Sequence, residues 1–513
     1  MKSAQRLLEY AASRGVSACF ANPGTSEMHL VAALDAVPQI KPILCLFEGV
    51  ATGAADGFGR MAQTPALTLL HLGPGLGNGL ANLHNAYRAR TPIVSLIGEH
   101  ATYHRANNPP LASDIKAIAS AVSAWMNTVE RPEDLVTGAA EAIDAAQASG
   151  PAALILPADV AWSDVEPNPA QPLQKAAPGK SWQGALDRAA RALNARAVLM
   201  LGGRYLSARA CAAAQRIAEK TGAQVYVETF PTRIAHGRDA APLKRLPYLT
   251  EMAVGMLANA ESIVLAGAAK PIAFFALPGR PTELAPQGAA LVEFFPPFGD
   301  PAEALEALAE AVGAPAKYAA AAEKPALPAD AGARIDPMGL AQAIAALMPE
   351  NAIISDESNT LGLYAYDACA GAAPHDWMTL TGGSIGQGLP LATGAAAACR
   401  DRRTIAIQAD GSALYTVQSL WTQAREGLNV TNIILNNGAY AILKLEMMRA
   451  GINAQTEAAA QLFDLQRPGI DFTHIASGFG VPSQRVTTVG ELMAAMQRSF
   501  ATPGPFLIEA MFA

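Results

Sequence analysis

The chain has 513 residues, of which 51% are apolar and 16% are charged. Such a chain can bury large cores, and at roughly 100–200 residues per domain it predicts about three domains. The formal net charge of −7 at pH 7 argues against a nucleic-acid-binding surface, which would be basic. No segment reaches the roughly 18 uninterrupted apolar residues of a membrane-spanning helix, so we expect no membrane partner.

The cysteines and the start of the chain indicate a cytoplasmic protein. The chain holds 5 cysteines, an odd number, and none of them forms a Cys-x-x-Cys pair. In a chain this long, the pattern is typical of reduced, buried thiols. Residues 1–10 are predicted to form an amphipathic helix without the apolar core of a signal peptide.

Two proline-rich segments divide the chain. They cover residues 162–179 and 319–337, and prolines at this density disfavour both helices and inner strands. We therefore predict an N-terminal domain over residues 1–165, a central domain over residues 180–318 and a C-terminal domain over residues 336–513.

Short apolar runs alternate with helical stretches in all three blocks. Unbroken apolar strands separated by helices are typical of parallel sheets covered on both faces. The predicted fold is therefore α/β, with three consecutive doubly wound parallel-sheet domains. Ligands of such sheets bind beyond the carboxyl ends of the strands. The predicted strands cover residues 67–71, 93–97, 153–156, 197–201, 263–266, 290–295, 352–355, 404–408, 432–435 and 506–509.

The strongest chemical signal follows two of the C-terminal strands. The strand at 404–408 runs into Asp410-Gly411-Ser412, a helix is predicted over 415–426, and the next strand ends in Asn436-Asn437. A strand–helix–strand crossover brings both strand ends to the same sheet edge. A carboxylate, an amide and nearby backbone carbonyls suit Mg²⁺, and a diphosphate would supply its remaining oxygen ligands. Gly411 and the Ser412 hydroxyl are expected to begin a helix whose N-terminus favours a phosphate.

Taken separately, Asp410-Gly411 is consistent with a simple turn and Asn436-Asn437 with a strand end. Together, at this spacing, they resemble the cofactor motif of thiamine-diphosphate-dependent 2-oxo acid decarboxylases and acetolactate synthases. The family usually has glycine where Ala409 stands, so an extra methyl group lies beside the diphosphate turn. The resemblance implies that the N-terminal domain binds the pyrimidine and the C-terminal domain the diphosphate. It implies Mg²⁺ held by the side chains of Asp410 and Asn437 and the carbonyl of Ala439, with Gly411, Ser412 and Tyr440 around the diphosphate.

An acid in the N-terminal block is the second signal. Glu48 follows the apolar residues 44–47 and precedes a predicted helix over 49–58. Acids are favoured at helix starts, so a helix-capping role is the alternative. With Ala55-Asp56-Gly57, Glu48 is similar to the family's Glu-x6-Ala-Asp-Gly pattern. That resemblance implies that Glu48 pairs with the pyrimidine nitrogen of the cofactor and promotes loss of the proton at thiazolium C2.

Two polar segments follow other strands of the N-terminal block. Asn22-Pro23-Gly24-Thr25 resembles a turn of benzoylformate decarboxylases, which implies that Asn22 binds the cofactor and Thr25 touches the substrate. His71 ends the predicted strand at 67–71 and matches an active-site histidine of the same family. The alternatives are a helix-capping hydroxyl and a structural histidine.

The glycines after His71 superficially resemble a dinucleotide-binding fingerprint. Gly73 and Gly75 match the first two glycines of Gly-x-Gly-x-x-Gly, but the third position is Asn78. Because the fingerprint fails, NAD is not expected.

Two segments before the metal motif complete the expected cofactor site. The resemblance implies that Asn359 contacts the cofactor and that the carbonyl of Gly383 accepts a hydrogen bond from its amine. It also implies that Ile385 supports the bent cofactor from beneath. A tight turn with a buried isoleucine is the alternative for residues 382–390, and both interpretations can hold together.

The resemblance covers all three blocks and implies catalysis on a small 2-oxo acid. Benzoylformate decarboxylases have a second active-site histidine in the central domain, where an ungapped comparison places Phe274. Phenylalanine cannot relay a proton, which favours carboligation to a 2-hydroxy ketone, as in acetolactate synthases. Phe274 and Ile442 are the expected substrate-pocket residues.

Release of an aldehyde, as in benzoylformate decarboxylases, is the alternative reaction. A catalytically inactive protein with a binding role is a remote alternative, against which the intact Asp410, Asn437 and Glu48 argue. FAD is common in the central domain of the synthases, but no flavin signal stands out here, so we do not expect it. The family shares its active sites between subunits, which implies a dimer or tetramer.

Overall fold

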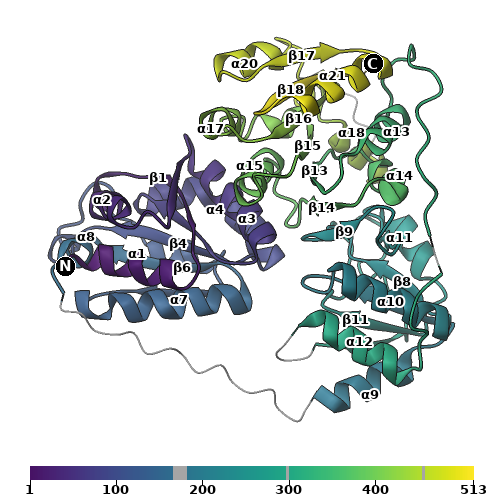
Figure 1. The fold of residues 1–513 in the computed structure, drawn as a ribbon, viewed down its shortest axis with the longest axis horizontal. Coiled ribbons are helices and arrows are strands. Elements are labelled where there is room, and N and C mark those ends of the chain that lie inside the picture. Colours follow the sequence, from purple (N-terminus) through teal and green to yellow (C-terminus); the bar gives the residue numbers. More distant parts are fainter. Residues whose placement is uncertain (166–181, 296–299, 320, 453–456, 513) are drawn as a thin grey trace.

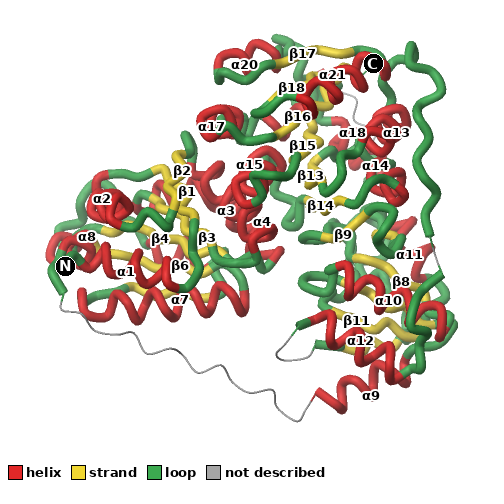
Figure 2. The backbone as a smooth tube through the Cα atoms, in the orientation of Figure 1, coloured by secondary structure: helices red, strands yellow, loops and turns green. Residues whose placement is uncertain are grey.

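Three α/β units follow one another along the chain, each with its own sheet between helices (Figure 1). This arrangement confirms the predicted fold class. Figure 2 shows the strands of each unit as a yellow layer with red helices on its faces. None of the helices formed by the described residues is long and apolar enough to span a membrane. The computed structural model describes residues 1–165, 182–295, 300–319, 321–452 and 457–512.

The N-terminal sheet has six parallel strands. Its order is β2 (Lys41–Leu44), β1 (Ala18–Asn22), β3 (Ala66–Leu70), β4 (Ile93–Glu99), β6 (Ala152–Pro157) and β5 (Trp125–Thr128). One face is covered by α1 (Ser3–Ser13), α2 (Met28–Ala36), α7 (Leu135–Ser149) and α8 (Ala158–Trp162). The other is covered by α3 (Glu48–Ala62), α4 (Leu72–Ala89) and α6 (Ile115–Ser120). The edge strand β5 was not predicted, because it is partly exposed and lacks an apolar run.

The central sheet has five parallel strands. Its order is β10 (Lys244–Arg245), β8 (Gln224–Val227), β7 (Ala197–Leu201), β11 (Ser262–Ala266) and β12 (Ala290–Glu293). One face is covered by α9 (Trp182–Ala192), α10 (Ala208–Thr221) and α12 (Pro301–Ala311), and the other by α11 (Thr250–Leu257).

The C-terminal sheet has seven strands. Its order is β17 (Ser483–Val486), β18 (Phe506–Met511), β16 (Val430–Asn436), β15 (Thr404–Ala409), β13 (Ala352–Glu357), β14 (His375–Thr379) and β9 (Ile234–His236). One face is covered by α13 (Pro337–Leu347), α14 (Ala365–Ala368) and α21 (Val489–Ala501). The other is covered by α15 (Gly388–Ala398), α17 (Ser419–Glu426) and α20 (Phe472–Gly478).

The strand β9 departs from the expectation of three self-contained sheets. It belongs to the central block but pairs antiparallel with β14, with His236 opposite His375. The buried ring of His236 stacks on Tyr366, with ring centroids 4.1 Å apart. A strand of three residues is too short to be recognised from an apolar run, so only the tertiary contact reveals it. The central domain is therefore tied to the C-terminal domain by a shared sheet.

A close helix–helix contact joins the N-terminal and C-terminal domains, where α3 packs against α15 (Figure 1). A side-chain carbon at Gly57 would lie 1.9 Å from the carbonyl oxygen of Leu391, and one at Gly394 would lie 1.7 Å from that of Ala54. The backbones approach this closely only because both positions are glycine. The contact lays α3, which begins at Glu48, along the first helix after residues 380–387.

The helix predicted over 415–426 is shorter in the structure, where it begins at Ser419. The structure has a one-turn helix α16 (Asp410–Ala413), a turn, and then α17. The Thr416 hydroxyl donates a hydrogen bond of 2.8 Å to the carbonyl of Gly386, which holds the turn against the loop before α15. Because α16 has only four residues, its dipole contributes less to phosphate binding than a long helix would.

Candidate active site

Asp410 and Asn437 meet at the carboxyl ends of the adjacent strands β15 and β16. Oδ2 of Asp410 accepts hydrogen bonds from the backbone N–H groups of Asn437 and Gly438, at 3.1 and 2.7 Å. Oδ1 accepts a bond of 2.7 Å from the backbone N–H of Gly411. Burial raises the pKa of Asp410, and these N–H groups oppose the rise. The adjacent strand ends therefore bring the two halves of the motif together in one partly buried turn, in which Asp410 is buried and Asn437 is half-buried.

The residues expected around a diphosphate surround this turn. Tyr440 covers Gly411, since a side-chain carbon at Gly411 would lie 2.4 Å from Cε1 of Tyr440. The Ser412 hydroxyl accepts a hydrogen bond from Gln408 and donates one to the carbonyl of Ala409. Ala409 has φ −70° and ψ 145°, an extended backbone that any residue adopts, so its methyl group causes no backbone strain.

The donor groups of the Asp410 turn fit Mg²⁺. Within the described part of the chain, no three or more His, Cys, Asp or Glu side chains form a cluster that could hold a metal ion. The turn offers instead one carboxylate, the Asn437 amide and backbone carbonyls. Mg²⁺ is commonly held by one or two carboxylates, with phosphate oxygens and water completing the octahedron. The residues present therefore suit a Mg²⁺–diphosphate pair better than a protein-only metal site.

Glu48 is the first residue of α3 and lies beyond the end of β2. Its side chain is 9% exposed, and Oε2 accepts a hydrogen bond of 3.0 Å from the side-chain amide of Asn78. A side-chain carbon at Gly75 would lie 3.3 Å from Oε1, so glycine leaves room beside this oxygen. The carboxylate is buried, and among the described residues Asn78 is its only side-chain hydrogen-bond partner.

His71 and the turn after β1 meet because β1 and β3 are neighbours in the sheet. His71 stands directly before α4, and its Nδ1 lies 2.8 Å from Oε2 of Glu27. The ring also lies against Gly24, where a side-chain carbon would be 2.2 Å from Nδ1. Thr25 is the exposed first residue of the short 3-10 helix Thr25–Glu27, and Asn22 is the half-buried last residue of β1.

Glu27 is fully buried beneath the turn. Its Oε2 also accepts a hydrogen bond of 2.8 Å from the backbone N–H of Gly24, whereas the buried Oε1 has no hydrogen-bond partner among the described residues. Burial raises the pKa of Glu27, and the backbone N–H of Gly24 and the neighbouring His71 oppose the rise. Glu27 is therefore placed to orient His71 and to share a proton with it.

The loop of residues 380–387 presents Gly383 and Ile385. Gly383 has φ +75°, in the left-handed region that favours glycine, and Ile385 is half-buried. At the end of β13, the buried carboxylate of Glu357 accepts hydrogen bonds from the backbone N–H groups of Gly386, at 2.6 Å, and Gly388. Asn359 is exposed in the turn that follows β13, with φ +50°.

Phe274 lies against this loop. A side-chain carbon at Gly383 would be 3.5 Å from Cε1 of Phe274. The ring packs edge-to-face on Phe230, with centroids 5.2 Å apart, and lies 5.3 Å from the ring of Tyr248. Ile442 is half-buried in α18 (Ala441–Arg449), which follows the metal turn. The central domain thus contributes an aromatic wall beside the expected cofactor loop.

The predicted residues fall into separate groups within one chain. Across the described residues, no hydrogen bond or ion pair links Glu48 or His71 to Asp410 or Asn437. The sequence motifs assigned no role to Glu27, Glu357, Asn82 or Asn85, which the structure places beside the predicted residues. An acid three residues after the Asn-Pro-Gly turn was an available signal for Glu27. The asparagines of α4 repeat at helical spacing, which was a signal for a shared face.

Comparison with known proteins identifies the class. Residues 1–118 match the N-terminal, and residues 361–510 the C-terminal, thiamine pyrophosphate (thiamine diphosphate) binding domain of thiamine pyrophosphate enzymes. The chain belongs to this family of enzymes, which includes decarboxylases and acetolactate synthases.

Three relatives show how far the likeness extends. A Mycobacterium tuberculosis protein provisionally named acetolactate synthase large subunit IlvX is 48% identical, over 100% of this chain and 99% of its own. The benzoylformate decarboxylase of Pseudomonas aeruginosa is 29% identical over 96% of each chain. The solved thiamine-diphosphate-dependent 4-hydroxybenzoylformate decarboxylase of Rhodococcus jostii RHA1 has 26% identity and a TM-score of 0.86, covering 100% of this chain and 99% of that chain.

Proposed function

We propose that the protein decarboxylates a 2-oxo acid with thiamine diphosphate and Mg²⁺, and joins the remaining carbon to a second carbonyl compound. The observation that carries the choice of carboligation is Phe274, whose ring lies against Gly383 without any group that can deliver a proton. The 48% identity to a protein provisionally named as an acetolactate synthase subunit supports the same choice.

In this proposal, each predicted site residue has a defined role in holding the metal or the cofactor. Side chains of Asp410 and Asn437 and the carbonyl of Ala439 hold Mg²⁺, and Gly411, Ser412 and Tyr440 flank the diphosphate. The carbonyl of Gly383 and the side chain of Ile385 orient the aminopyrimidine, with Asn22 and Asn359 as further contacts.

Bound thiamine diphosphate supplies the carbon nucleophile and the electron sink for loss of CO₂. Glu48 exchanges a proton with the pyrimidine nitrogen. His71 and Thr25 orient the substrate carboxylate, and Phe274 and Ile442 contact its side chain.

A second candidate is release of an aldehyde, and the His71–Glu27 pair favours it. A histidine backed by a buried carboxylate can deliver a proton to the carbon that has lost CO₂. The Rhodococcus relative of similar fold is a decarboxylase by name, which supports this candidate as well.

The test is a screen for CO₂ release from pyruvate, branched 2-oxo acids and benzoylformate, with product analysis. The proposal expects CO₂ together with a 2-hydroxy ketone, whereas aldehyde alone would favour the second candidate. Asp410→Ala should abolish binding of thiamine diphosphate with Mg²⁺, measured by calorimetry, and with it all CO₂ release. Unchanged affinity in that variant would contradict the metal assignment.

We further propose a dimer or tetramer with active sites shared between subunits. Glu48 and Asp410 lie in different domains without a direct link, which is compatible with their serving different sites. Subunit exchange between inactive Glu48→Gln and inactive Asp410→Ala proteins should restore part of the activity, because one intact site forms per mixed pair. No recovery despite proven exchange would count against shared sites.

A further inference from the structure

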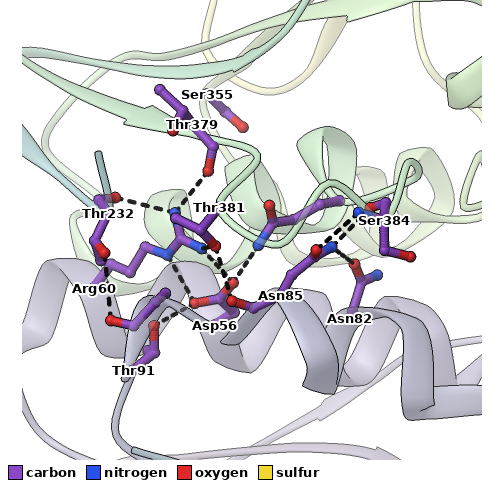
Figure 3. Close-up of polar contacts among 12 residues, drawn as sticks. Asp56, Arg60, Asn82, Asn85, Thr91, Thr232, Ser355, Thr379, Thr381 and Ser384 are labelled. Carbon is purple, nitrogen blue, oxygen red and sulfur yellow. Dashed lines mark hydrogen bonds and ion pairs between the residues drawn. The ribbon is translucent and has the colours of Figure 1, made fainter. Parts of the chain in front are cut away.

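The side chain of Asn85 in α4 forms two hydrogen bonds with the backbone of Ser384, in the loop of residues 380–387 (Figure 3). Its Nδ2 donates a hydrogen bond of 2.7 Å to the carbonyl of Ser384, and its Oδ1 accepts one of 3.1 Å from the backbone N–H of the same residue. The Asn85 side chain is fully buried. A side-chain carbon at Gly382 would lie 2.5 Å from Oδ1 of Asn85, so glycine permits the close approach.

Asn85 is one of three asparagines on the same face of α4. Asn82 donates to the carbonyls of Gly49 and Gly386, at 2.8 and 3.3 Å, and accepts a bond from Asn85. Asn78, one turn earlier, donates to Glu48. This face therefore touches the start of α3 and the loop at once.

The two ends of the loop are fixed by a buried ion pair of α3, Asp56 with Arg60. Arg60 donates to the carbonyl of Thr379 and the hydroxyl of Thr381, each at 2.9 Å, while Gln387 donates to Asp56. Between these anchors, and among the described residues, Asn85 is the only hydrogen-bond partner of Ser384 in the N-terminal domain, while Nε2 of His84 lies 3.1 Å from the carbonyl of the nearby Gly382. The direction of the peptides on either side of Ser384 therefore depends on the Asn85 amide.

We propose that Asn85 is a positioning residue for the cofactor, and that it acts through Ser384 by fixing the carbonyl of Gly383 and the side chain of Ile385. The inference rests on the proposed function, since it takes Gly383 and Ile385 as the contacts of the aminopyrimidine. With both backbone groups of Ser384 paired, the neighbouring peptides cannot rotate freely. Without the amide, Gly383 can leave its left-handed conformation, because glycine adopts many others at low cost.

Loss of the Asn85 amide should weaken the binding of only the aminopyrimidine half of the cofactor. In the part of the chain that the structure describes, the side chain of Asn85 hydrogen-bonds to Asn82 and Ser384 and not to the Asp410 turn, so its loss should leave the diphosphate and metal half intact. Inorganic diphosphate with Mg²⁺ therefore serves as a probe that lacks the pyrimidine. A general weakening of the fold would instead affect both ligands.

The variants are Asn85→Ala and the smaller change Asn85→Ser, with Thr68→Val as a control. Thr68 is a buried threonine of the N-terminal sheet that donates a hydrogen bond of 3.0 Å to Ser95, a partner within the same sheet. Calorimetry with Mg²⁺ should show at least tenfold weaker binding of thiamine diphosphate in both Asn85 variants, and unchanged binding of inorganic diphosphate. The control should bind both ligands as the wild type does.

Hydrogen exchange of the cofactor-free proteins gives a second readout. Peptides covering the loop should exchange faster in the Asn85 variants than in the control, and the amide of Ser384 should be protected in the wild type. Fast exchange of that amide in the wild type would overturn the inference even if the variants failed to fold.

The outcomes separate this inference from the proposed function. If the wild type does not bind thiamine diphosphate, both are wrong. If the wild type binds it and the Asn85 variants bind it equally well, only the inference on Asn85 is wrong. Equal weakening of both ligands would make Asn85 a structural residue and would also overturn it.

Discussion

Nδ1 of His71 lies 2.8 Å from Oε2 of Glu27, although the two residues follow different strands of the N-terminal sheet. A carboxylate at this position holds the proton on Nδ1, which leaves Nε2 as the nitrogen that can serve a substrate. Burial raises the pKa of Glu27, and the backbone N–H of Gly24 and the neighbouring His71 oppose the rise and favour the carboxylate. His71 is thus an oriented group rather than an isolated side chain.

Glu27→Gln should lower kcat by roughly 10- to 100-fold, part of the 10²–10⁴-fold that a positioned acid–base group contributes. Glutamine keeps the size but not the negative charge that orients the imidazole. The measurement is steady-state kinetics of Glu27→Gln, His71→Ala and the double variant. If Glu27 acts through His71, the double variant should be no slower than His71→Ala. Additive losses would contradict that dependence.

Glu48→Gln should slow exchange of the cofactor's C2 hydrogen with D₂O by about 10²–10⁴-fold, since loss of a proton-relay partner has effects of this size. NMR after acid quench measures the exchange directly, before any carbon bond changes. Calorimetry should show that the variant still binds thiamine diphosphate. Exchange at the normal rate would mean that Glu48 is not the activating acid.

Phe274→His should raise the ratio of aldehyde to 2-hydroxy ketone, because the imidazole supplies a proton donor beside Gly383. The adjacent Phe275 is 63% exposed and takes no part in the ring contacts of Phe230 and Tyr248, so Phe275→His is a matched control. Product analysis by chromatography measures the ratio, while C2 hydrogen exchange should stay unchanged. An unaltered ratio in Phe274→His would remove the residue-level support for carboligation.

Glu228 should make the stability of the protein depend on pH. Burial raises its pKa from 4.5 to about 7, against a hydrogen bond from the backbone N–H of Gly203. Between these two pKa values, the folded protein keeps a proton on Glu228 that the unfolded chain has released. The stability that this proton contributes is fully present below pH 4.5 and is lost as the pH rises to about 7.

Glu228→Gln should remove that loss. Relative to the wild type, its free energy of unfolding should rise by at most about 3 kcal/mol between the two ends of this range. A pKa difference of one corresponds to about 1.4 kcal/mol, and solvation of the half-buried side chain reduces the effect. Urea unfolding of both proteins at about pH 5 and about pH 7.5 measures the difference. A difference that does not change with pH would contradict the assignment.

Much of the fold could be predicted because buried parallel strands carry their signal locally. The strand at 197–201 has the predicted bounds, and the strands at 404–408 and 432–435 were extended by only one or two residues at their ends. β5 and β9 were not predicted, because a partly exposed edge strand and a three-residue strand carry no apolar run that could indicate them. The turn that divides the helix predicted over 415–426 depends on a hydrogen bond to a distant loop, which no local pattern reports.

The sequence by itself determined that Asp410 and Asn437 reach one sheet edge, because a strand–helix–strand crossover brings both strand ends together, and the resemblance of its motifs indicated the class of the protein. Only the tertiary structure decided which groups lie beside the predicted site residues. Glu27 reaches His71 because β1 and β3 are adjacent, and Asn85 reaches Ser384 because α3 and α4 pack against the C-terminal domain. The partners in each pair are far apart in the chain. The Glu27–His71 contact forms when the N-terminal sheet assembles, and the Asn85–Ser384 hydrogen bonds form only when two domains pack together.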